Sequence, residues 1–598
     1  MDRKSILILV GCFVLLMLWG PLVNLIYPPP VRPAKASTNL VAGATAPGPQ
    51  RTNIAAAAPA APTISAPGGP APAPWVAPAG PETLLLMETP EALYTFTSHG
   101  GGLKHVELLG FTESVGNGRR GPARSNQWAT LNRNARVPAL ALRGGGALAD
   151  AGAFQLTRTG GVVRAERELT NGLRIVKEFR FATNHLVKAA IRIENRAAEP
   201  LVLPAHELVI GSATPINPRD SGQFLGVQWY DGARAEFQNQ AWFANRTLGC
   251  LPGTPRTEFQ SAGVSNVVWA AVHNQFFSLI AAPAYNAPQL VAREFELPPP
   301  TREEREADSR LNAKPFGFEA ALSYPPQVLP PGQGLEHTLD LFAGPKEYNT
   351  LAKLGKNQDL AMNFTTFFGW FAKALLLSMN GLHHGLKLSY GLTIIAITVI
   401  IKLLFWPLTQ ASTRSMKRMQ ALQPQMKALQ EKYKEDPKKM NLKLMEFMKE
   451  NKVNPMGGCL PMLLQVPVFI GFYQMLQSAI ELRGASFLWA HDLSQPDTVV
   501  EVLGFPINPL PLIMGATQFW QARLTPPSPG VDPMQQKMMQ YMPLIFLFIL
   551  YNFPAGLALY WTVQNLLTIL QMHLTKAAGG PQSPAALAKP PAPAAKKR

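Results

Sequence analysis

The fold of this chain is decided by the stretch Tyr390-Gly-Leu-Thr-Ile-Ile-Ala-Ile-Thr-Val-Ile-Ile-Lys-Leu-Leu-Phe-Trp406, which is apolar except for one charge, Lys402. A bilayer core of about 30 Å needs roughly 20 apolar helical residues, and the segment 388–408 has that length. A lysine at bilayer depth costs roughly 2.5–3.5 kcal/mol on insertion scales. We therefore predict a transmembrane helix whose Lys402 faces a polar interior; a lysine that snorkels to the cytoplasmic surface is the alternative.

Further apolar runs lie on both sides of this span. They cover residues 6–26, 461–480, 507–522, 538–553 and 557–573. The first follows Asp2-Arg3-Lys4 and predicts an uncleaved signal anchor over residues 1–27, with a lipoprotein box at Cys12 and a signal-peptidase site at Ala34-Lys35-Ala36 as alternatives. The last three runs are short for spanning, which indicates a thinned bilayer or a water-accessible hollow. The expected fold is a polytopic α-helical membrane protein with six spans.

The charges of the connecting segments predict the topology. Residues 412–455 carry 11 Lys/Arg and 5 Asp/Glu, a net charge of +6. Residues 480–506 carry 1 Arg and 4 Asp/Glu, a net charge of −3. Positive loops stay in the cytoplasm, so the first segment should lie inside and the second outside. Counting spans from a cytoplasmic N-terminus gives the same result and places the C-terminus inside. Much of the net charge of +17 is therefore explained by basic cytoplasmic segments that set the membrane topology, and nucleic-acid binding is not needed to explain it.

The basic segment 412–455 has the pattern of a helical hairpin. Its apolar residues recur at spacings of three and four, as in a heptad seam. The first helix has Met419, Leu422, Met426, Leu429 and Tyr433, and the second has Met440, Leu444 and Phe447. The break falls at Asp436-Pro437, and Pro424 should kink the first helix. Together with the basic tail 576–598, the hairpin is a candidate contact for a ribosome or a signal-recognition targeting factor.

Between the first span and the core lies a stretch of different character. Residues 28–81 are rich in Pro and Ala and predict an extended linker. Residues 82–346 show period-2 alternation and Gly-rich turns, as in Leu173-Arg174-Ile175 and Gly100-Gly101-Gly102, and predict a large β domain outside the cytoplasm. An aromatic-rich run at helical spacing over residues 359–378 predicts an amphipathic helix in the membrane interface, or else a core helix that docks the β domain.

Polar side chains inside the spans are the candidate functional residues. Thr398 lies one helical turn before Lys402, and Gln465 and Asn565 lie in later spans. No Asp or Glu occurs in the last five spans, so Lys402 lacks an obvious partner there and suits transient attraction of acidic groups. Three dispersed cysteines make neither a disulfide framework nor a metal site. Catalytic motifs and phosphate loops are absent, so we expect no enzyme, cofactor or metal.

Several longer motifs closely resemble the YidC/Oxa/Alb insertase family. They are Lys452-Val-Asn-Pro-Met-Gly-Gly-Cys-Leu-Pro461, Gln465-Val-Pro-Val-Phe469, Asp532-Pro-Met-Gln-Gln-Lys537, Phe553-Pro-Ala-Gly556 and Leu559-Tyr-Trp-Thr-Val-Gln-Asn565. Tyr94-Thr-Phe-Thr-Ser-His-Gly-Gly-Gly102 and Leu341-Phe-Ala-Gly-Pro345 fit the large periplasmic domain of the Gram-negative YidC type.

The resemblance implies a bacterial inner-membrane protein that inserts nascent membrane proteins, alone or with the Sec translocon. Five spans, here 388–573, would surround a hydrophilic groove open to cytoplasm and lipid, and residues 82–346 would form a β-supersandwich of sugar-mutarotase type. Lys402 occupies the place of a usual arginine, so we expect it to act through long-range electrostatic attraction and not through strictly bidentate hydrogen bonding. Phe469, Tyr560 and Trp561 match substrate-contacting aromatics. A small-molecule transporter and an envelope enzyme acting on sugars are the alternatives.

Overall fold

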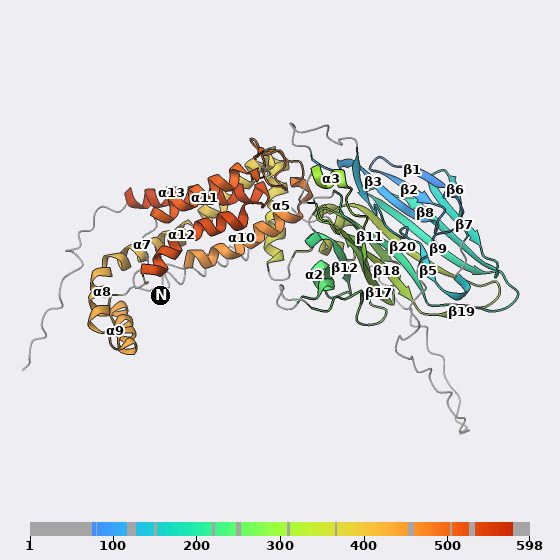
Figure 1. The fold of residues 1–598 in the computed structure, drawn as a ribbon, viewed down its shortest axis with the longest axis horizontal. Helices are drawn as coiled ribbons and strands as arrows, with labels where there is room; N and C mark the ends of the chain where they lie inside the picture. Colours follow the sequence, from blue (N-terminus) through green and yellow to red (C-terminus); the bar gives the residue numbers. More distant parts are fainter. Residues whose placement is uncertain are drawn as a thin grey trace, which may run out of the picture. The chain divides into compact units, whose positions relative to one another are not determined.

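A computed structural model describes most of the chain (Figure 1). The described residues are 75–78, 80–115, 127–148, 152–217, 220, 222–246, 253–307, 311–364, 368–451, 460–502, 505–524 and 533–577. The predicted anchor 1–27, nearly all of the linker 28–81, almost the whole tail 576–598 and the three cysteines lie outside these ranges. The chain divides into two compact units, one containing residues 126–361 and the other residues 362–598.

The first unit is built on a nine-stranded antiparallel sheet. Its strand order is β13 (Ala235–Asn239), β12 (Gly226–Tyr230), β15 (Trp269–His273), β16 (Phe277–Pro283), β20 (Gly334–Pro345), β9 (Leu186–Asn195), β8 (Leu173–Phe181), β7 (Val162–Glu168) and β6 (Gln155–Thr159). Successive side chains of a strand point to opposite faces. On β8, Ile175 and Phe179 are therefore buried on one face, whereas Arg174 on the other face pairs with Glu166 and Glu194.

Two smaller sheets cover the apolar face of the nine-stranded sheet. One has the order β14 (Glu258–Gln260), β17 (Gln289–Glu296), β18 (Phe316–Tyr324), β11 (His206–Ala213) and β5 (Leu142–Gly144). The other has the order β1 (Leu84–Glu88), β2 (Ala92–Thr97), β3 (Gly102–Thr112) and β4 (Trp128–Leu131). Phe96 of β2 lies 4.8 Å from Phe179 of β8, and β11 contacts β15 and β16. The prediction of a large all-β domain is confirmed, and its layers form a sandwich.

Residues 139–141 join the two smaller sheets and explain one glycine of the predicted turn. Ala139 exchanges backbone hydrogen bonds with Leu103, and the carbonyl of Ala141 accepts from Val209. A side chain at Gly102 would place its Cβ 2.1 Å from the carbonyl oxygen of Ala139. Only glycine therefore fits at this crossing between the sheets.

The second unit is helical. Its helices are α5 (Gly369–Leu386), α6 (Tyr390–Leu404), α7 (Trp406–Ala421), α8 (Gln423–Lys432), α9 (Pro437–Glu450), α10 (Leu460–Ser478), α11 (Pro509–Leu524), α12 (Pro533–Leu550) and α13 (Ala555–Ala577). Helix α13 packs against α11 and α6, and α5 packs against α10. Within the described ranges, no single helix is both long enough and apolar enough to be a membrane span. Helices α5 and α6 reach that length and apolarity only when they are taken together, and they are bent by 117° relative to each other.

Two predicted helices differ from the observed ones. The run 359–378 is interrupted, because Asn363 has a φ of 56° that an α-helix cannot accommodate. A short 3-10 turn at Gln358–Met362 precedes it, and α5 begins only at Gly369. Pro424 does not kink a continuous helix, because α7 ends at Ala421 and Pro424 lies in the first turn of α8, where its missing N–H costs nothing.

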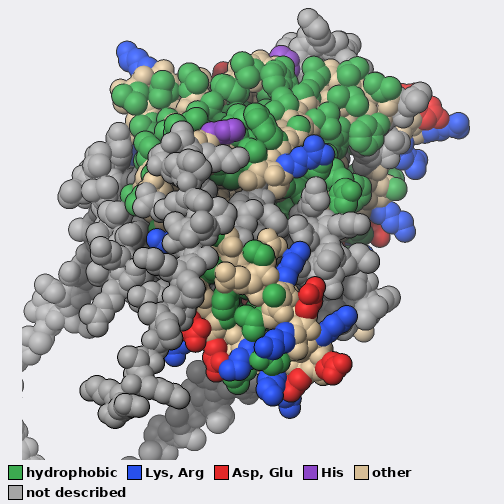
Figure 2. All heavy atoms as spheres, turned by 90° about the vertical axis from the view of Figure 1, so that its left-hand side faces the viewer, with side chains coloured by type: hydrophobic (Ala, Val, Ile, Leu, Met, Phe, Trp, Pro, Cys, Tyr) green, Lys and Arg blue, Asp and Glu red, His purple; other side chains and the backbone are tan. Residues whose placement is uncertain are grey.

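The hairpin region consists of α8 and α9, which contact each other. Met419, Leu422 and Phe447 pack together as a small core, and the side chain of Asp436 caps α9 by accepting a hydrogen bond from the Lys439 backbone. In Figure 2, charged side chains gather at the lower end of the molecule over this hairpin, and hydrophobic side chains cover the helices above it. The seam is therefore internal and the basic faces are open to solvent.

Candidate functional site

Lys402 is held within the helical unit. Its side chain projects from α6, the residue is only 6% exposed, and Nζ donates a hydrogen bond to Oγ1 of Thr568 on α13 at 2.7 Å. Thr568 in turn donates to the backbone oxygen of Gln564 at 2.7 Å. Within the part of the chain that the structure describes, no carboxylate forms an ion pair with Lys402. The ammonium group is thus buried against neutral polar partners, which leaves its charge uncompensated locally.

Thr398 supports this position without contacting the charge. It is fully buried one turn before Lys402, and its hydroxyl donates to the backbone oxygen of Ile394 at 2.7 Å. A threonine that bonds back to its own helix satisfies its hydroxyl in an apolar setting. The structure therefore places Thr398 beside Lys402 as a packing residue.

Gln465 links two helices through a polar relay. Its Nε2 donates to the hydroxyl of Tyr560 at 2.5 Å, and its Oε1 accepts from Nε2 of Gln564 at 3.0 Å. Both partners lie on α13, so the relay joins α10 to the helix that also holds Thr568. Side-chain hydrogen bonds between helices fix the relative position of those helices.

The predicted aromatic residues meet at the same pair of helices. Phe469 of α10 and Trp561 of α13 lie edge to face with centroids 4.8 Å apart, and both are partly exposed. Tyr560 is buried and stacks on Phe472 at 4.1 Å. The structure therefore separates neighbours in sequence: Trp561 belongs to an accessible aromatic surface, whereas Tyr560 belongs to the interior.

Asn565 reaches a different helix. It is buried, and its Nδ2 donates to the backbone oxygen of Met514 at 3.3 Å and to Oγ1 of Thr517 at 3.2 Å, both on α11. Asn565 thus joins α13 to α11 and is not brought together with Lys402. A buried asparagine with these partners holds helices together.

Two residues that contact the predicted site residues were not among them. Thr568 is the partner of Lys402, and Gln564 extends the relay from Gln465. Both lie on α13: Gln564 is three residues after Trp561 and Thr568 is four residues after Gln564, and this helical spacing is the sequence signal that points to them. Further along the same helix, Gln571 donates to Thr409 at 2.5 Å, so α13 forms polar contacts at several levels.

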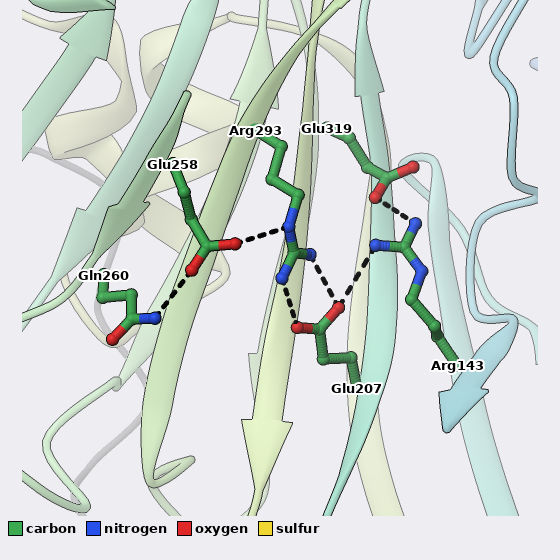
Figure 3. Close-up of polar contacts among 6 residues, drawn as sticks. All are labelled: Arg143, Glu207, Glu258, Gln260, Arg293 and Glu319. Carbon is green, nitrogen blue, oxygen red and sulfur yellow. Dashed lines mark hydrogen bonds and ion pairs between the residues drawn. The ribbon is translucent and has the colours of Figure 1, made fainter. Parts of the chain in front are cut away.

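The β domain contains an ionic cluster that the sequence did not reveal (Figure 3). Glu207 accepts from Nη1 and Nη2 of Arg293 at 2.8 and 2.7 Å and from Arg143 at 3.3 Å. Arg143 also pairs with Glu319, and Arg293 pairs with Glu258 at 2.7 Å. These five residues come from the five strands of one sheet, and each guanidinium has two carboxylates. Such mutual pairing indicates a structural role.

Two histidines of the β domain also meet. Nε2 of His206 lies 3.1 Å from Nε2 of His337, and Tyr324 stacks on His206 at 5.4 Å. Burial and the neighbouring His206 lower the pKa of His337 to about 4. No set of three metal-binding side chains occurs in the described ranges, and this pair has no third ligand there.

Comparisons with known proteins bear on both units. A family model described as 60Kd inner membrane protein matches residues 381–580, and one described as YidC periplasmic domain matches residues 86–377. A relative from Paraburkholderia phytofirmans, called membrane protein insertase YidC, is 33% identical over 428 residues, which cover 70% of each chain. The chain belongs to the YidC family.

Other YidC proteins align over shorter parts. The relative from Pelobacter propionicus is 46% identical over 279 residues, which are 45% of this chain and 50% of the relative. The chain thus spans about half the length of several of the YidC relatives that it matches. A solved structure of an active YidC insertase is 17% identical, with 84% of this chain and 94% of that chain covered and a TM-score of 0.33. As a YidC-family chain, it combines an inner-membrane part with a periplasmic all-β domain.

Proposed function

We propose that this protein inserts membrane proteins into the inner membrane, with six spans, both termini in the cytoplasm and the β domain in the periplasm. The observation that carries the proposal is Lys402, a buried cation bonded only to a neutral hydroxyl within the described residues. Since an isolated charge in an apolar bundle is costly, its position favours a function that uses the charge. The YidC names of the relatives support the same activity.

The proposed mechanism is physical and has no covalent step. The acidic or polar tail of a client would be drawn toward Lys402 along the polar side chains of α10 and α13, among them Gln465 and Thr568. The client's apolar helix would then slide over Phe469 and Trp561 and leave into lipid, because transfer of apolar surface out of water is favourable. Neither a cofactor nor a nucleotide enters this scheme.

The partners follow from the same arrangement. Nascent membrane proteins are the clients, and membrane lipids receive their spans. We further propose the Sec translocon as a second partner and a ribosome or targeting factor as the ligand of the α8–α9 hairpin. The hairpin's open basic faces and internal Met and Leu seam suit this contact.

The proposal is tested by changing the charge of Lys402. A client charge attracted from about 8 Å through an effective dielectric of 20 gains about 2 kcal/mol, or roughly 30-fold in occupancy. Lys402→Ala should therefore reduce insertion of a client with an acidic tail by about that factor, and Lys402→Arg should retain activity. Lys402→Glu should be worst, because it repels acidic tails. Insertion is measured by protease protection in proteoliposomes.

The matched control is Thr568→Val, which removes the hydrogen-bond partner and leaves the charge. It should preserve the preference for acidic over neutral tails. Two clients that differ only in tail charge are compared in every variant. Equal insertion of both clients by all variants would contradict electrostatic capture, and a uniform loss with lowered protein levels would assign Lys402 to folding.

A further inference from the structure

Residues 479–508 connect α10 to α11 and are fixed to one end of the helical unit. The carbonyls of Gln495 and Leu493 accept hydrogen bonds from the backbones of Ala555 and Gly556 at 2.8 and 2.9 Å, at the start of α13. The side chain of Asp497 accepts from the backbone of residue 510 at 2.6 Å, at the start of α11. The connection therefore lies at the level where these helices begin.

Within this connection, strands β21 (Val500–Val502) and β22 (Phe505–Ile507) pair antiparallel. Val500 lies opposite Ile507, and Val502 opposite Phe505, so these four apolar side chains share one face. Val502 is 51% exposed and Phe505 is 57% exposed. Glu501 and Pro506 occupy the other face. An isolated strand pair is stable in water only when its apolar face packs against other parts of the protein, and the apolar face of this pair is exposed.

The strand pair is firmly held, so its exposed face is not the result of loose packing. The hydroxyl of Tyr551, just after α12, donates to the carbonyl of Pro506 at 2.6 Å, and its ring stacks on Phe505 at 5.3 Å. Asn508 is fully buried and donates to the carbonyl of Tyr551 at 2.9 Å. The pair is thereby attached to the end of α12.

A second exposed apolar group lies in the same connection. Phe487 and Ala490 exchange backbone hydrogen bonds of 2.8 and 2.9 Å around the two-residue turn Leu488-Trp489. Leu488 has a φ of 52° and is 72% exposed, although left-handed backbone favours glycine. Trp489 directs its Nε1 inward to Asp497 at 2.9 Å. A leucine with a strained backbone and an exposed apolar side chain indicates that this side chain contacts an apolar environment outside the protein.

We propose that Leu488, Val500, Val502 and Phe505, here called the loop face, insert into the interfacial region of the bilayer. The inference rests on the transmembrane arrangement in the proposed function. It is supported by the two adjoining helices, because the first two turns of α11 and the last two turns of α12 also carry exposed apolar side chains. These are Leu512, Ile513, Leu544, Ile545, Phe548 and Ile549.

Charge favours lipid over an ionic partner. The segment 480–506 has a net charge of −3, and two of its acidic side chains, Asp492 and Asp497, are buried. Glu481 accepts a hydrogen bond from Asn380 at 2.7 Å. The loop face itself carries no charge. Its contact with the bilayer is therefore hydrophobic and should not depend on anionic lipids or on salt.

The test uses the full chain with its native cysteines replaced, reconstituted in zwitterionic lipid vesicles. Spin labels are attached to single cysteines in the variants Val502→Cys and Leu488→Cys. His491→Cys, an exposed polar position of the same connection, is the water control, and Phe548→Cys on α12 is the lipid control. Collisions with oxygen, which concentrates in lipid, and with a water-soluble nickel complex are compared.

We expect the oxygen-to-nickel ratio at residues 502 and 488 to exceed that at residue 491 by several-fold, and adding anionic lipid or salt should leave it unchanged. Nickel access equal to that at residue 491 would overturn the proposal. Low access of both reagents would also overturn it, since it would mean that protein covers the loop face. If the label at residue 548 also favours nickel, the transmembrane arrangement itself fails, which separates the two proposals.

Discussion

The ionic cluster of the β domain makes a quantitative prediction for Glu207→Gln. Glu207 is almost fully buried and accepts three charge-assisted hydrogen bonds from Arg143 and Arg293. Removing one member of a buried ionic group costs about 3–5 kcal/mol. Because each guanidinium keeps one carboxylate, Glu319 or Glu258, we expect the lower end, about 3 kcal/mol. This corresponds to roughly a hundredfold change in the unfolding equilibrium.

The matched control is Glu336→Gln on the solvent face of the same domain. Its pair with Arg192 has side chains that are 43% and 44% exposed, and such pairs contribute about 0–1 kcal/mol. Both variants of the full chain are unfolded in urea in detergent, and a short proteolysis pulse reports the intact β domain at each concentration. The reasoning is refuted if the two urea midpoints shift equally.

Two further predictions concern pH and topology. The pKa of His337 is lowered to about 4 from an unfolded value near 6.5, so the unfolded chain binds more protons between these values. β-domain stability should therefore fall by up to about 3 kcal/mol as pH drops through this window, and His337→Phe should flatten the profile of urea midpoint against pH. Single cysteines at Lys438 and at the exposed His491 should react with impermeant reagents from opposite sides of the membrane. Labelling of residue 438 in intact cells would refute the six-span arrangement.

The sequence predicted the architecture where one physical signal dominated. Apolar runs correspond to α6 and α10 to α13, and period-2 alternation corresponds to strands such as β8. The alternation did not identify Lys177 as unusual, although it lies on the buried face of β8 between Ile175 and Phe179. Its ammonium group donates to the carbonyls of Gly100 and Leu140 at 2.6 and 2.7 Å. Burial lowers its pKa to about 7. The carbonyls that accept hydrogen bonds from this buried lysine are distant in sequence, so the local sequence pattern does not predict its burial.

The candidate site was predictable in part. Lys402 was identifiable because a single charge interrupts an apolar run, and helical spacing placed Thr398 on the same face one turn earlier. Its partner Thr568 lies 166 residues further on, and that pairing depends on how α6 packs on α13. The cluster around Glu207 depends in the same way on strand order, which the sequence did not determine.

The strand order has a consequence for biosynthesis. β20 is the last strand of the nine-stranded sheet along the chain, yet it lies in the middle, between β16 and β9. β9 therefore pairs on one side with a strand more than a hundred residues downstream. Until β20 is available, the hydrogen-bonding edges of β9 and β16 remain unpaired. The meander of β6 to β9 can form early, but the sandwich closes only after residue 345 has been exported. A nascent chain stalled before β20 would expose both edges to aggregation or to a holding chaperone.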